Sequence, residues 1–415
     1  MQNSTHTLGI DFGTSNSAAG ICVNGKPFLI DVEPGEQTLP TSVFFDFEAR
    51  KTTFGSPANR ALINGNEGRY MRSLKSVLGT GLMHEPRRMM GETLTFVDII
   101  ARFLKTLKER AETACHREFH YALSGRPVHF HSNDAERDVK ALRDLTACYE
   151  RAGFQSVRFL NEPEAAALAS GNLPKGSLNL IVDIGGGTSD FTLFRSQGET
   201  HDVLASYGVR IGGTNFDKSI SFDHVMPLMG RGTQIRKELG TELLTAPNAI
   251  YQDLATWEKI PFLYTPETRR SVDQMIRVGV DPKRFERLQT ILTDELGHDL
   301  AFSVERGKIA MNQATRDSVP IDLGLIEKGL TADLNAEMLT SSLTDHATAI
   351  GETALETLRM AQIERDQLDT IIFVGGSSLM AQVEATLTTL FPKAHQKREN
   401  AFTAIVEGLA LASAT

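Results

Sequence analysis

The chain has 415 residues, a length that suggests two or three domains, and its 41% hydrophobic and 23% charged residues are typical of a globular protein. The formal net charge of −9 argues against a nucleic-acid partner, which would favour a basic surface. Three scattered cysteines, an N-terminus without an apolar signal region and the lack of a long apolar run predict a cytoplasmic protein with no membrane partner.

The chain is predicted to begin with strands and a long helix. Residues 6–30 form two strands around Asn24-Gly25, a pair that favours a hairpin because both turn positions need a positive φ. A helix is expected within residues 95–119, because apolar side chains recur there at helical spacing. They would share one face of the helix: Val97, Ile100, Phe103 or Leu104, and Leu107.

Strands and helices continue along the rest of the chain. Residues 128–130 predict a short strand, and 134–151 predict a second amphipathic helix that ends before Gly153. The later elements are expected in this order: strands in 179–196 and 201–209, a helix opening in 212–220, a mostly helical and polar region in 222–312, a strand, Gly-Gly turn and helix in 368–391, and a closing helix in 400–414. No Pro-rich linker marks a domain boundary.

Two distant stretches of the sequence resemble each other. LGIDFGTSNSAAGI (8–21) and LIVDIGGGTSDFTLF (180–194) both contain a strand, an aspartate, one apolar residue, a glycine turn with Thr-Ser and a returning strand. Self-similarity of this kind indicates an internal duplication. We therefore predict two related halves that face each other across a cleft.

The residue types at the two turns are suited to binding phosphate. Glycines let backbone N–H groups converge on an anion without a Cβ in the way. Two such cradles that grip one polyphosphate from opposite sides suit ATP. The first would consist of Gly13, Thr14 and Ser15, and the second of Gly185, Gly186, Gly187 and Thr188. Plain glycine-containing hairpins are the alternative, which two copies make less favourable than one copy would.

An aspartate ends the strand before each turn and would lie close to the phosphates. Carboxylates and phosphates repel each other unless a cation lies between them. Mg²⁺, held largely through its water molecules, is the natural occupant. The sequence therefore predicts a magnesium-bound nucleotide beside Asp11 and Asp183.

Five motifs resemble those of one protein family. They are GIDFGTSNS (9–17), FLNEPEAAALA (159–169), VDIGGGTSDFTLF (182–194), GGTNFD (212–217) and IIFVGGSS (371–378). The paired turns resemble those of actin, sugar kinases and heat-shock ATPases. The finer motifs resemble the DnaK-like seventy-kilodalton heat-shock family, and in layout the chain is similar to the short YegD-like group within it.

The resemblance implies an α/β protein with the actin-like ATPase fold, in which two duplicated ribonuclease-H-like lobes surround a nucleotide cleft. The expected division is lobe I in 1–175 with an inserted subdomain at about 34–115, lobe II in 176–400 with its core in 176–221 and 313–400 and a helical insertion in 222–312, and a helix in 401–415 that closes onto lobe I. The chain is expected to contain the family's nucleotide-binding domain and to lack its peptide-binding domain.

The resemblance also implies catalytic roles for individual residues. Lys75 matches a lysine that orients the attacking water and offsets charge on the γ-phosphate, and Glu162 matches the glutamate that acts with it. Thr188 matches a threonine near the γ-phosphate. Three aspartates match residues around the magnesium ion: Asp11, Asp183 and Asp190. A solvated surface lysine is the alternative for Lys75.

Further positions match residues that contact the rest of the nucleotide. They are Gly212, Gly213, Gly375, Gly376 and Ser377, together with Glu305 and Lys308, which would reach the ribose. A helical i,i+3 ion pair between Glu305 and Lys308, worth about 0.2–0.5 kcal/mol, is the alternative for those two.

The expected base site departs from the family pattern. The family holds adenine between two arginines, whereas Ile309 and Leu379 occupy the matching positions here, and Phe402 replaces an aspartate near the base. Apolar faces could still grip a purine. The cation–π contribution, roughly 0.5–2 kcal/mol for each contact, would be lost.

The sequence therefore predicts a switch protein that binds ATP or ADP with Mg²⁺ and hydrolyses ATP slowly. Its partners would be nucleotide and a co-chaperone or client protein, and the chain would be a monomer. Three alternatives stay open: a small-molecule kinase on the same fold, a filament-forming protein, and a nucleotide-binding module without turnover. A kinase would need an aspartate aimed at a substrate hydroxyl, whereas Lys75 and Asn161-Glu162-Pro163 favour water.

Overall fold

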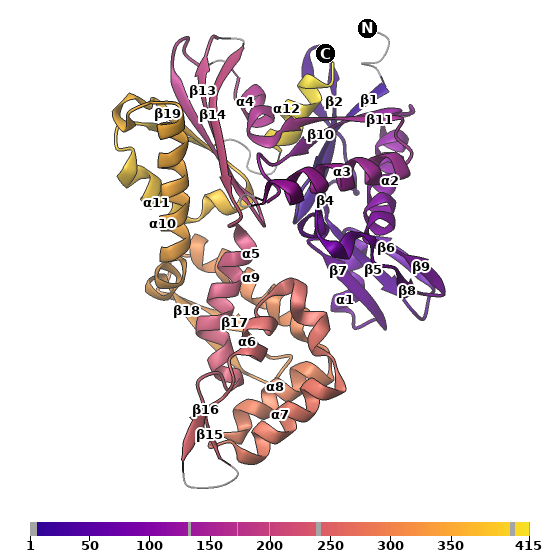
Figure 1. Ribbon diagram of the computed structural model, residues 1–415, viewed down its shortest axis with the longest axis vertical. Coiled ribbons are helices and arrows are strands. Elements are labelled where there is room, and N and C mark those ends of the chain that lie inside the picture. The colour runs from indigo at the N-terminus through magenta and orange to yellow at the C-terminus, as the bar shows by residue number, and fades with distance from the viewer. Residues whose placement is uncertain are drawn as a thin grey trace. The chain divides into compact units, whose positions relative to one another are not determined.

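The computed structural model describes residues 6–131, 134–171, 173–198, 200–237, 242–398 and 403–414. The chain divides into two compact units, whose elements are labelled in Figure 1. Unit 1 consists of Met1–Gly212, Ala349–Leu379 and Val383–Thr415, and unit 2 of Gly213–Thr348 and Met380–Gln382. Within the described ranges, no helix is both long enough and apolar enough to cross a membrane.

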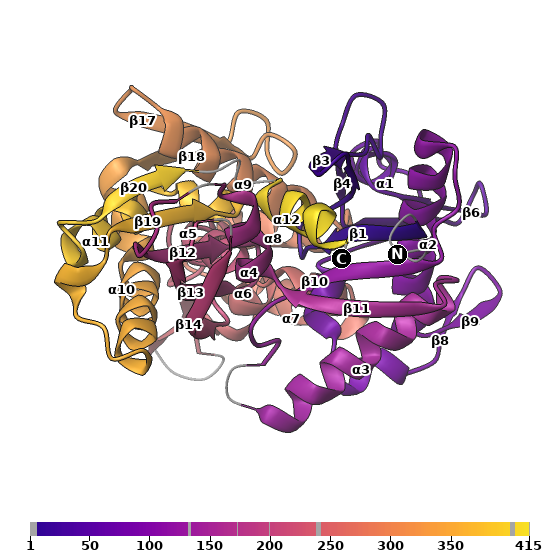
Figure 2. The same ribbon diagram turned by 90° about the horizontal axis from the view of Figure 1, so that it is seen from above.

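Unit 1 contains two large sheets with the same strand arrangement (Figure 2). The first has the order β3-β2-β1-β10-β11, and the second has the order β14-β13-β12-β19-β20. In both, the first two pairings along this order are antiparallel and the last two are parallel. The two sheets therefore confirm the internal duplication that was predicted from the two similar sequences.

The first sheet begins with the predicted N-terminal hairpin. Its strands are β1 (Thr7–Phe12), β2 (Asn16–Val23), β3 (Lys26–Leu29), β10 (Tyr121–Arg126) and β11 (Ser156–Asn161), and β4 (Thr38–Pro40) also pairs with β2. Asn24 and Gly25 join β2 to β3 with φ angles of 53° and 74°, so the predicted turn is confirmed.

Two long helices pack against each other and against this sheet. They are α2 (Phe96–Cys115) and α3 (Ala135–Arg151), and both were predicted. The Thr95 side chain accepts a hydrogen bond from the Asp98 backbone and so caps α2, and Asp134 caps α3 in the same way. The predicted apolar face of α2 is buried: Val97, Ile100, Phe103, Leu104 and Leu107.

Small elements lie between β4 and α2. They are a three-stranded sheet of β5 (Ser42–Asp46), β6 (Lys51–Phe54) and β7 (Gly68–Arg72), the helix α1 (Ser56–Ile63), the 3₁₀ turns η2 (Leu74–Val77) and η3 (Gly81–His84), and the pair β8 (Arg87–Met89) and β9 (Glu92–Leu94). Leu74, Leu78 and Met83 from this region share a buried cluster with residues of α2. That packing anchors η2, the turn that carries Lys75.

The second sheet consists of β12 (Leu178–Ile184), β13 (Ser189–Ser196), β14 (His201–Val209), β19 (Thr370–Val374) and β20 (His395–Arg398). Every residue of β12 is buried, which fits a central strand covered on both faces. The predicted strand, Gly-Gly turn and helix are confirmed by β19, η8 (Gly376–Leu379) and α11 (Ala381–Leu390). The turn η7 (Arg365–Gln367) precedes β19.

Two short helices in unit 1 each follow a strand of one sheet and pack against the other sheet. Helix α4 (Glu162–Ala169) follows β11 of the first sheet but also packs on β12 and β13 of the second. Helix α12 (Ala404–Ala412), the predicted closing helix, follows β20 of the second sheet but packs on β1, β2 and β3 of the first. The two helices touch closely, because a Cβ added at Gly408 would lie 1.7 Å from the backbone oxygen of Ala165.

Unit 2 is mostly helical between residues 222 and 312, as predicted. Its elements are α5 (Gly213–Ile220), η4 (Ser221–Val225), η5 (Met226–Met229), β15 (Gln234–Arg236), β16 (Leu243–Thr245), α6 (Ala249–Leu254), η6 (Trp257–Leu263), α7 (Pro266–Val278), α8 (Pro282–Thr293), α9 (Gly297–Gln313), β17 (Ser318–Asp322), β18 (Thr331–Asn335) and the first part of α10 (Ala336–Met360). The antiparallel pairs β15-β16 and β17-β18 were not predicted.

The strand predicted at residues 128–130 is wrong. Its backbone N–H groups are bound by side chains rather than by a neighbouring strand. Val128 N donates to Asp190 Oδ1 at 3.0 Å, and Phe130 N donates to Asp138 Oδ1 at 2.6 Å. Because these carboxylates already satisfy the donors, the segment forms an irregular connection between β10 and α3 instead of a ladder.

Candidate functional site

The two glycine turns of unit 1 lie against each other. One joins β1 to β2 and the other joins β12 to β13. A Cβ added at Gly186 would lie 2.4 Å from Ser15 Oγ, and one added at Gly187 would lie 3.4 Å from Thr14 Oγ1. The structure therefore brings together the two turns that the sequence paired by their chemistry.

The glycines of these turns serve different purposes. At Gly13 a Cβ would lie 2.2 Å from the backbone oxygen of Asn16, so the first turn itself requires glycine. The nearest atom to a Cβ at Gly185 would be Thr188 O at 3.8 Å, an ordinary contact. Gly186 is the position of the second turn at which a side chain would meet the first turn most closely.

Lys75 and Glu162 form a buried ion pair. Lys75 Nζ lies 2.5 Å from Glu162 Oε1, and the exposed fractions of the two residues are 9% and 6%. Lys75 comes from η2, whereas Glu162 is the first residue of α4. The alternative of a solvated surface lysine is therefore wrong for Lys75.

Three aspartates from the two sheets interact electrostatically with this pair. Asp11 lies on β1, Asp183 on β12 and Asp190 on β13. Burial, followed by the charge of Glu162, raises the pKa of Asp11 to about 7, and Lys75 opposes the shift. Burial, followed by Glu162, also raises the pKa of Asp190 to about 7, and burial raises the pKa of Asp183 well above its ordinary value.

One lysine therefore faces an excess of carboxyl groups. Burial by itself would lower the pKa of Lys75, but the negative charges of Glu162, Asp11 and Asp190 together raise it above its ordinary value. The raised pKa values of the aspartates show that their ionised forms are poorly compensated. An additional cation would relieve this repulsion.

No cluster of three or more metal-ligating side chains is present among the residues that the structure describes. Asp190 and Asp183 instead each pack against a neighbouring glycine. Asp190 Oδ1 accepts from Val128 N at 3.0 Å and occupies the space beside Gly208, where a Cβ would lie 2.5 Å away. A Cβ at Gly375 would lie 2.7 Å from Asp183 Oδ1.

The remaining predicted residues of unit 1 follow these turns. Gly212 lies beside the second turn, since a Cβ there would lie 2.6 Å from Gly187 N. Gly376, Ser377 and Leu379 belong to η8, directly after β19, and Leu379 is 38% exposed. The structure thus places Gly375 beside Asp183 and the rest of that motif immediately after it.

Four predicted residues lie in unit 2. Gly213 opens α5, and Glu305, Lys308 and Ile309 lie on α9. Lys308 is buried, and its Nζ lies 2.7 Å from Asp217 Oδ1. The partner of Lys308 in this pair is thus Asp217 on α5 rather than a helical neighbour.

The outer face of α9 presents an apolar side chain. Ile309 is 46% exposed, one position after the buried Lys308. Lys308 Nζ also lies 3.4 Å from the backbone oxygen of Gly213, so two of the predicted nucleotide contacts meet within unit 2. Phe402 lies outside the described residues.

Sequence reasoning missed a polar group next to Lys75. Arg210 Nη1 lies 3.2 Å from His131 Nδ1, and Arg210 Nη2 donates to the backbone oxygen of Ser76. The first two residues are 79 positions apart, so no local spacing could have paired them. The strand predicted at residues 128–130, directly before His131, is absent from the structure.

Comparison with models of known protein families shows to which family the chain belongs. A model described as "Hsp70 protein" matches residues 7–88, 86–294 and 283–415. The chain belongs to the Hsp70 family. It therefore has the actin-like ATPase fold of that family, in agreement with the duplicated sheets. Membership supports an ATP-binding domain of the chaperone type.

Three curated relatives of this Hsp70-family chain carry the name "Chaperone protein DnaK". The protein from Methanothermobacter thermautotrophicus is 26% identical over 89% of this chain and 73% of its own length. The one from Thermosipho melanesiensis is 27% identical over 99% of the chain and 59% of its length, and that from Endomicrobium trichonymphae is 29% identical over 75% and 48%. The chain thus spans between about half and three quarters of these relatives.

Proposed function

We propose that this chain binds ATP with Mg²⁺ at the two facing glycine turns and hydrolyses it slowly, as a switch. The main support is that Gly186 lies close to Ser15, together with the buried ion pair of Lys75 and Glu162. Two opposed turns can bind a polyphosphate from both sides, and the buried pair can act on a water at its end.

Lys75 and Glu162 would position the attacking water, and Thr188 would help to hold the γ-phosphate. The lysine would also offset charge that develops on the transferred group. Because the pair is buried, its electrostatic effect on a nearby phosphate would be larger than in water. Hydrolysis would then alter the arrangement of the lobes, which is how a slow nucleotide hydrolase acts as a switch.

The acidic residues fit a magnesium ion. Asp11, Asp183 and Asp190 would bind it largely through its water molecules, and the nucleotide phosphates would supply further oxygen ligands. A divalent cation would also compensate the repulsion that raises the pKa values of these aspartates. Mg²⁺ would supply charge neutralisation of the phosphates when bound.

The base would be held by apolar contacts. Ile309 and Leu379 are both exposed aliphatic residues, and either could pack on a purine face. Such contacts to a ring face select little between ATP and GTP, and we expect them to bind the base more weakly than two stacked arginines would. Gly212, Gly213, Gly376, Ser377, Glu305 and Lys308 would contact the remaining parts of the nucleotide.

A chaperone role in the cell is a further part of this proposal. It is supported by the family and by the relatives named DnaK, and it would require a co-chaperone or client protein as partner. A cytoplasmic location and a monomeric state belong to the same proposal. The buried pair of Lys75 and Glu162 favours water as the acceptor over the hydroxyl of a kinase substrate.

Calorimetric titration with ATP and ADP, with and without Mg²⁺, tests the proposal if phosphate release is followed in the same samples. Magnesium-dependent binding with slow phosphate release is the expected result. Binding without release would instead identify a nucleotide-binding module, and phosphate transfer to a small molecule would identify a kinase. ATP-dependent light scattering that rises with protein concentration would indicate a filament. No binding of either nucleotide would overturn the proposal.

A further inference from the structure

The turn that carries Lys75 is short and depends on groups outside it. η2 has 4 residues and begins after Ser73, whose φ of 57° lies in the left-handed region. A single 3₁₀ turn has poorer hydrogen-bond geometry than an α-helix and is weakly held by its own backbone. The position of the Lys75 ammonium therefore depends on the groups that bind this turn.

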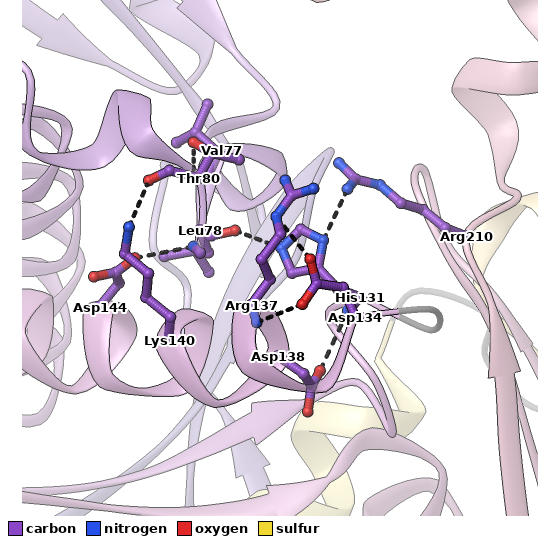
Figure 3. A network of polar contacts seen from close by, with 11 residues as sticks. Val77, Leu78, Thr80, His131, Asp134, Arg137, Asp138, Lys140, Asp144 and Arg210 are labelled. Carbon is purple, nitrogen blue, oxygen red and sulfur yellow. Dashed lines mark hydrogen bonds and ion pairs between the residues drawn. The ribbon is translucent and has the colours of Figure 1, made fainter.

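Two carbonyl groups of this segment receive hydrogen bonds from elsewhere in unit 1, and Figure 3 shows the one between His131 and Leu78. His131 Nε2 lies 2.7 Å from the backbone oxygen of Leu78, and Arg210 Nη2 donates to that of Ser76 at 3.2 Å. A carbonyl oxygen can only accept, so His131 carries its hydrogen on Nε2. Its Nδ1 then accepts from Arg210 Nη1 at 3.2 Å. His131 is buried and Arg210 is exposed, so the histidine joins the guanidinium to the buried end of the turn.

Arg210 comes from the second sheet. It directly follows β14, and the next residue, Ile211, accepts a hydrogen bond from Ser189 Oγ at 2.7 Å. Gly212 then packs beside Gly187 of the second glycine turn. Arg210 is thus two residues from a contact with that turn, while its side chain reaches the Lys75 segment beside the first sheet.

We propose that Arg210 and His131 are positioning residues that align the Lys75 turn with the second glycine turn. The proposal rests on the proposed ATP hydrolysis and deepens it, because it links the phosphate-binding turn of one sheet to the lysine beside the other. Neither residue needs to touch the nucleotide. A shift of the Gly212 segment would move the guanidinium and, through Ser76 and Leu78, the reach of Lys75.

The same segment has contacts that do not cross between the sheets. Asp144 Oδ2 accepts from Gly79 N at 2.9 Å, and Lys140 Nζ donates to the backbone oxygen of Thr80 at 3.4 Å (Figure 3). Both side chains come from α3, which packs on the first sheet. Lys140 therefore offers a matched control, because its loss removes a contact to this segment without removing a link to the second sheet.

The proposed effect of Arg210 on catalysis is tested by turnover measurements on three variants: Arg210→Met, Arg210→Lys and Lys140→Met. For Arg210→Met we expect kcat to fall about tenfold and the Kd of ATP to stay within about twofold, because small displacements of a catalytic group cost rate more than binding. Arg210→Lys should recover part of kcat, since an ammonium can still donate to one carbonyl. Lys140→Met should resemble the wild type. An equal loss in Lys140→Met, or an unchanged kcat in Arg210→Met, would overturn the positioning role.

Amide hydrogen exchange of residues 76–80 in the nucleotide-free protein tests the link without any turnover. Arg210→Met should exchange about fivefold faster there than the wild type, because the segment opens more often, and Lys140→Met should change less. Unchanged exchange in Arg210→Met would reject the link even if the protein hydrolyses ATP. Faster exchange in a protein that does not hydrolyse ATP would instead support the link and reject the proposed function.

Discussion

The ammonium of Lys75 meets the carboxylate of Glu162 at 2.5 Å, although the two residues are 87 positions apart in the sequence. Both side chains are almost fully buried, so neither charge is stabilised by bulk water. Such a pair is costly to place inside a protein unless its geometry is favourable. The pair lies among three aspartates with raised pKa values. Perturbed pKa values of this kind favour a functional site over a pair that only stabilises the fold.

Replacement of either member of this pair should reduce ATP hydrolysis and leave nucleotide bound. We expect Lys75→Ala and Glu162→Ala each to lower kcat by about 100-fold, because each removes a group that is proposed to act in the transition state. The Kd of ATP should change much less. Phosphate release and calorimetry on the same samples measure the two quantities, and unchanged turnover in both variants would contradict the assignment.

Stability measurements control for damage to the fold. Removal of one member of a buried pair leaves an uncompensated charge and should cost about 3–5 kcal/mol of unfolding free energy. The double variant Lys75→Met with Glu162→Gln should recover part of that loss while staying inactive. A double variant that is stable and hydrolyses ATP normally would show that the pair is structural.

Asp183→Asn should weaken the magnesium dependence of nucleotide binding. Asp183 is only 5% exposed, and burial and the neighbouring carboxyl groups raise its pKa, so a cation that binds there would favour its ionised form. We expect the affinity gained from Mg²⁺ to fall about tenfold, as for residues that orient a metal through its outer contacts. Asp366→Asn, at an exposed aspartate paired with Lys393, is the control. Equal magnesium dependence in both variants would reject the metal assignment.

Asp190 should make the nucleotide-free protein less stable as the pH rises. Its pKa is raised from 3.8 to about 7 in the folded state, so the folded protein holds this proton more tightly than the unfolded chain does. The stabilisation is present below the unfolded value and is lost as pH approaches the folded value. Between roughly pH 4 and pH 7, Asp190 should lower the unfolding free energy by up to about 1.4 kcal/mol for each pH unit, and Asp190→Asn should remove this dependence on pH. Urea denaturation of both proteins across this range gives the difference, and parallel dependences of stability on pH would show that folding does not raise the pKa of Asp190.

Gly186→Ala should destabilise the protein by about 1–3 kcal/mol, because the new methyl group would collide with Ser15 Oγ. Ser15→Ala removes that oxygen, and the nearest Ser15 atom to the new methyl would then be its Cβ at 3.6 Å. The double variant should therefore recover most of the loss. Gly185→Ala, where the nearest atom would be 3.8 Å away, should cost little. Thermal unfolding without nucleotide measures all three, and equal effects at the two glycines would show that the turns are farther apart than described.

The sequence could predict features that depend on local pattern. The two glycine turns, the hairpin at Asn24-Gly25 and the apolar face of α2 all follow from residue types at short spacing, and the structure contains them. The duplication could also be predicted, because the two copies keep the same order of aspartate, glycine and Thr-Ser. The roles of the site residues stay predictions.

Features that depend on long-range contacts could not be predicted. The sequence of residues 128–130 predicts a strand, but carboxylates from α3 and β13 accept the hydrogen bonds of its N–H groups in place of a neighbouring strand. The pairing of His131 with Arg210 joins two sheets and has no local signal. The raised pKa values of the aspartates likewise depend on burial, which spacing along the chain does not reveal.

The packing of α12 on the first sheet affects how the protein folds during synthesis. β1 starts at Thr7, yet α12, which covers it, consists of Ala404–Ala412. At about 5–20 residues per second, a ribosome needs roughly 20–80 s to pass from one to the other. From the synthesis of β11 until α12 emerges, the first sheet has an uncovered apolar face, and nascent chains should need protection from aggregation in that interval.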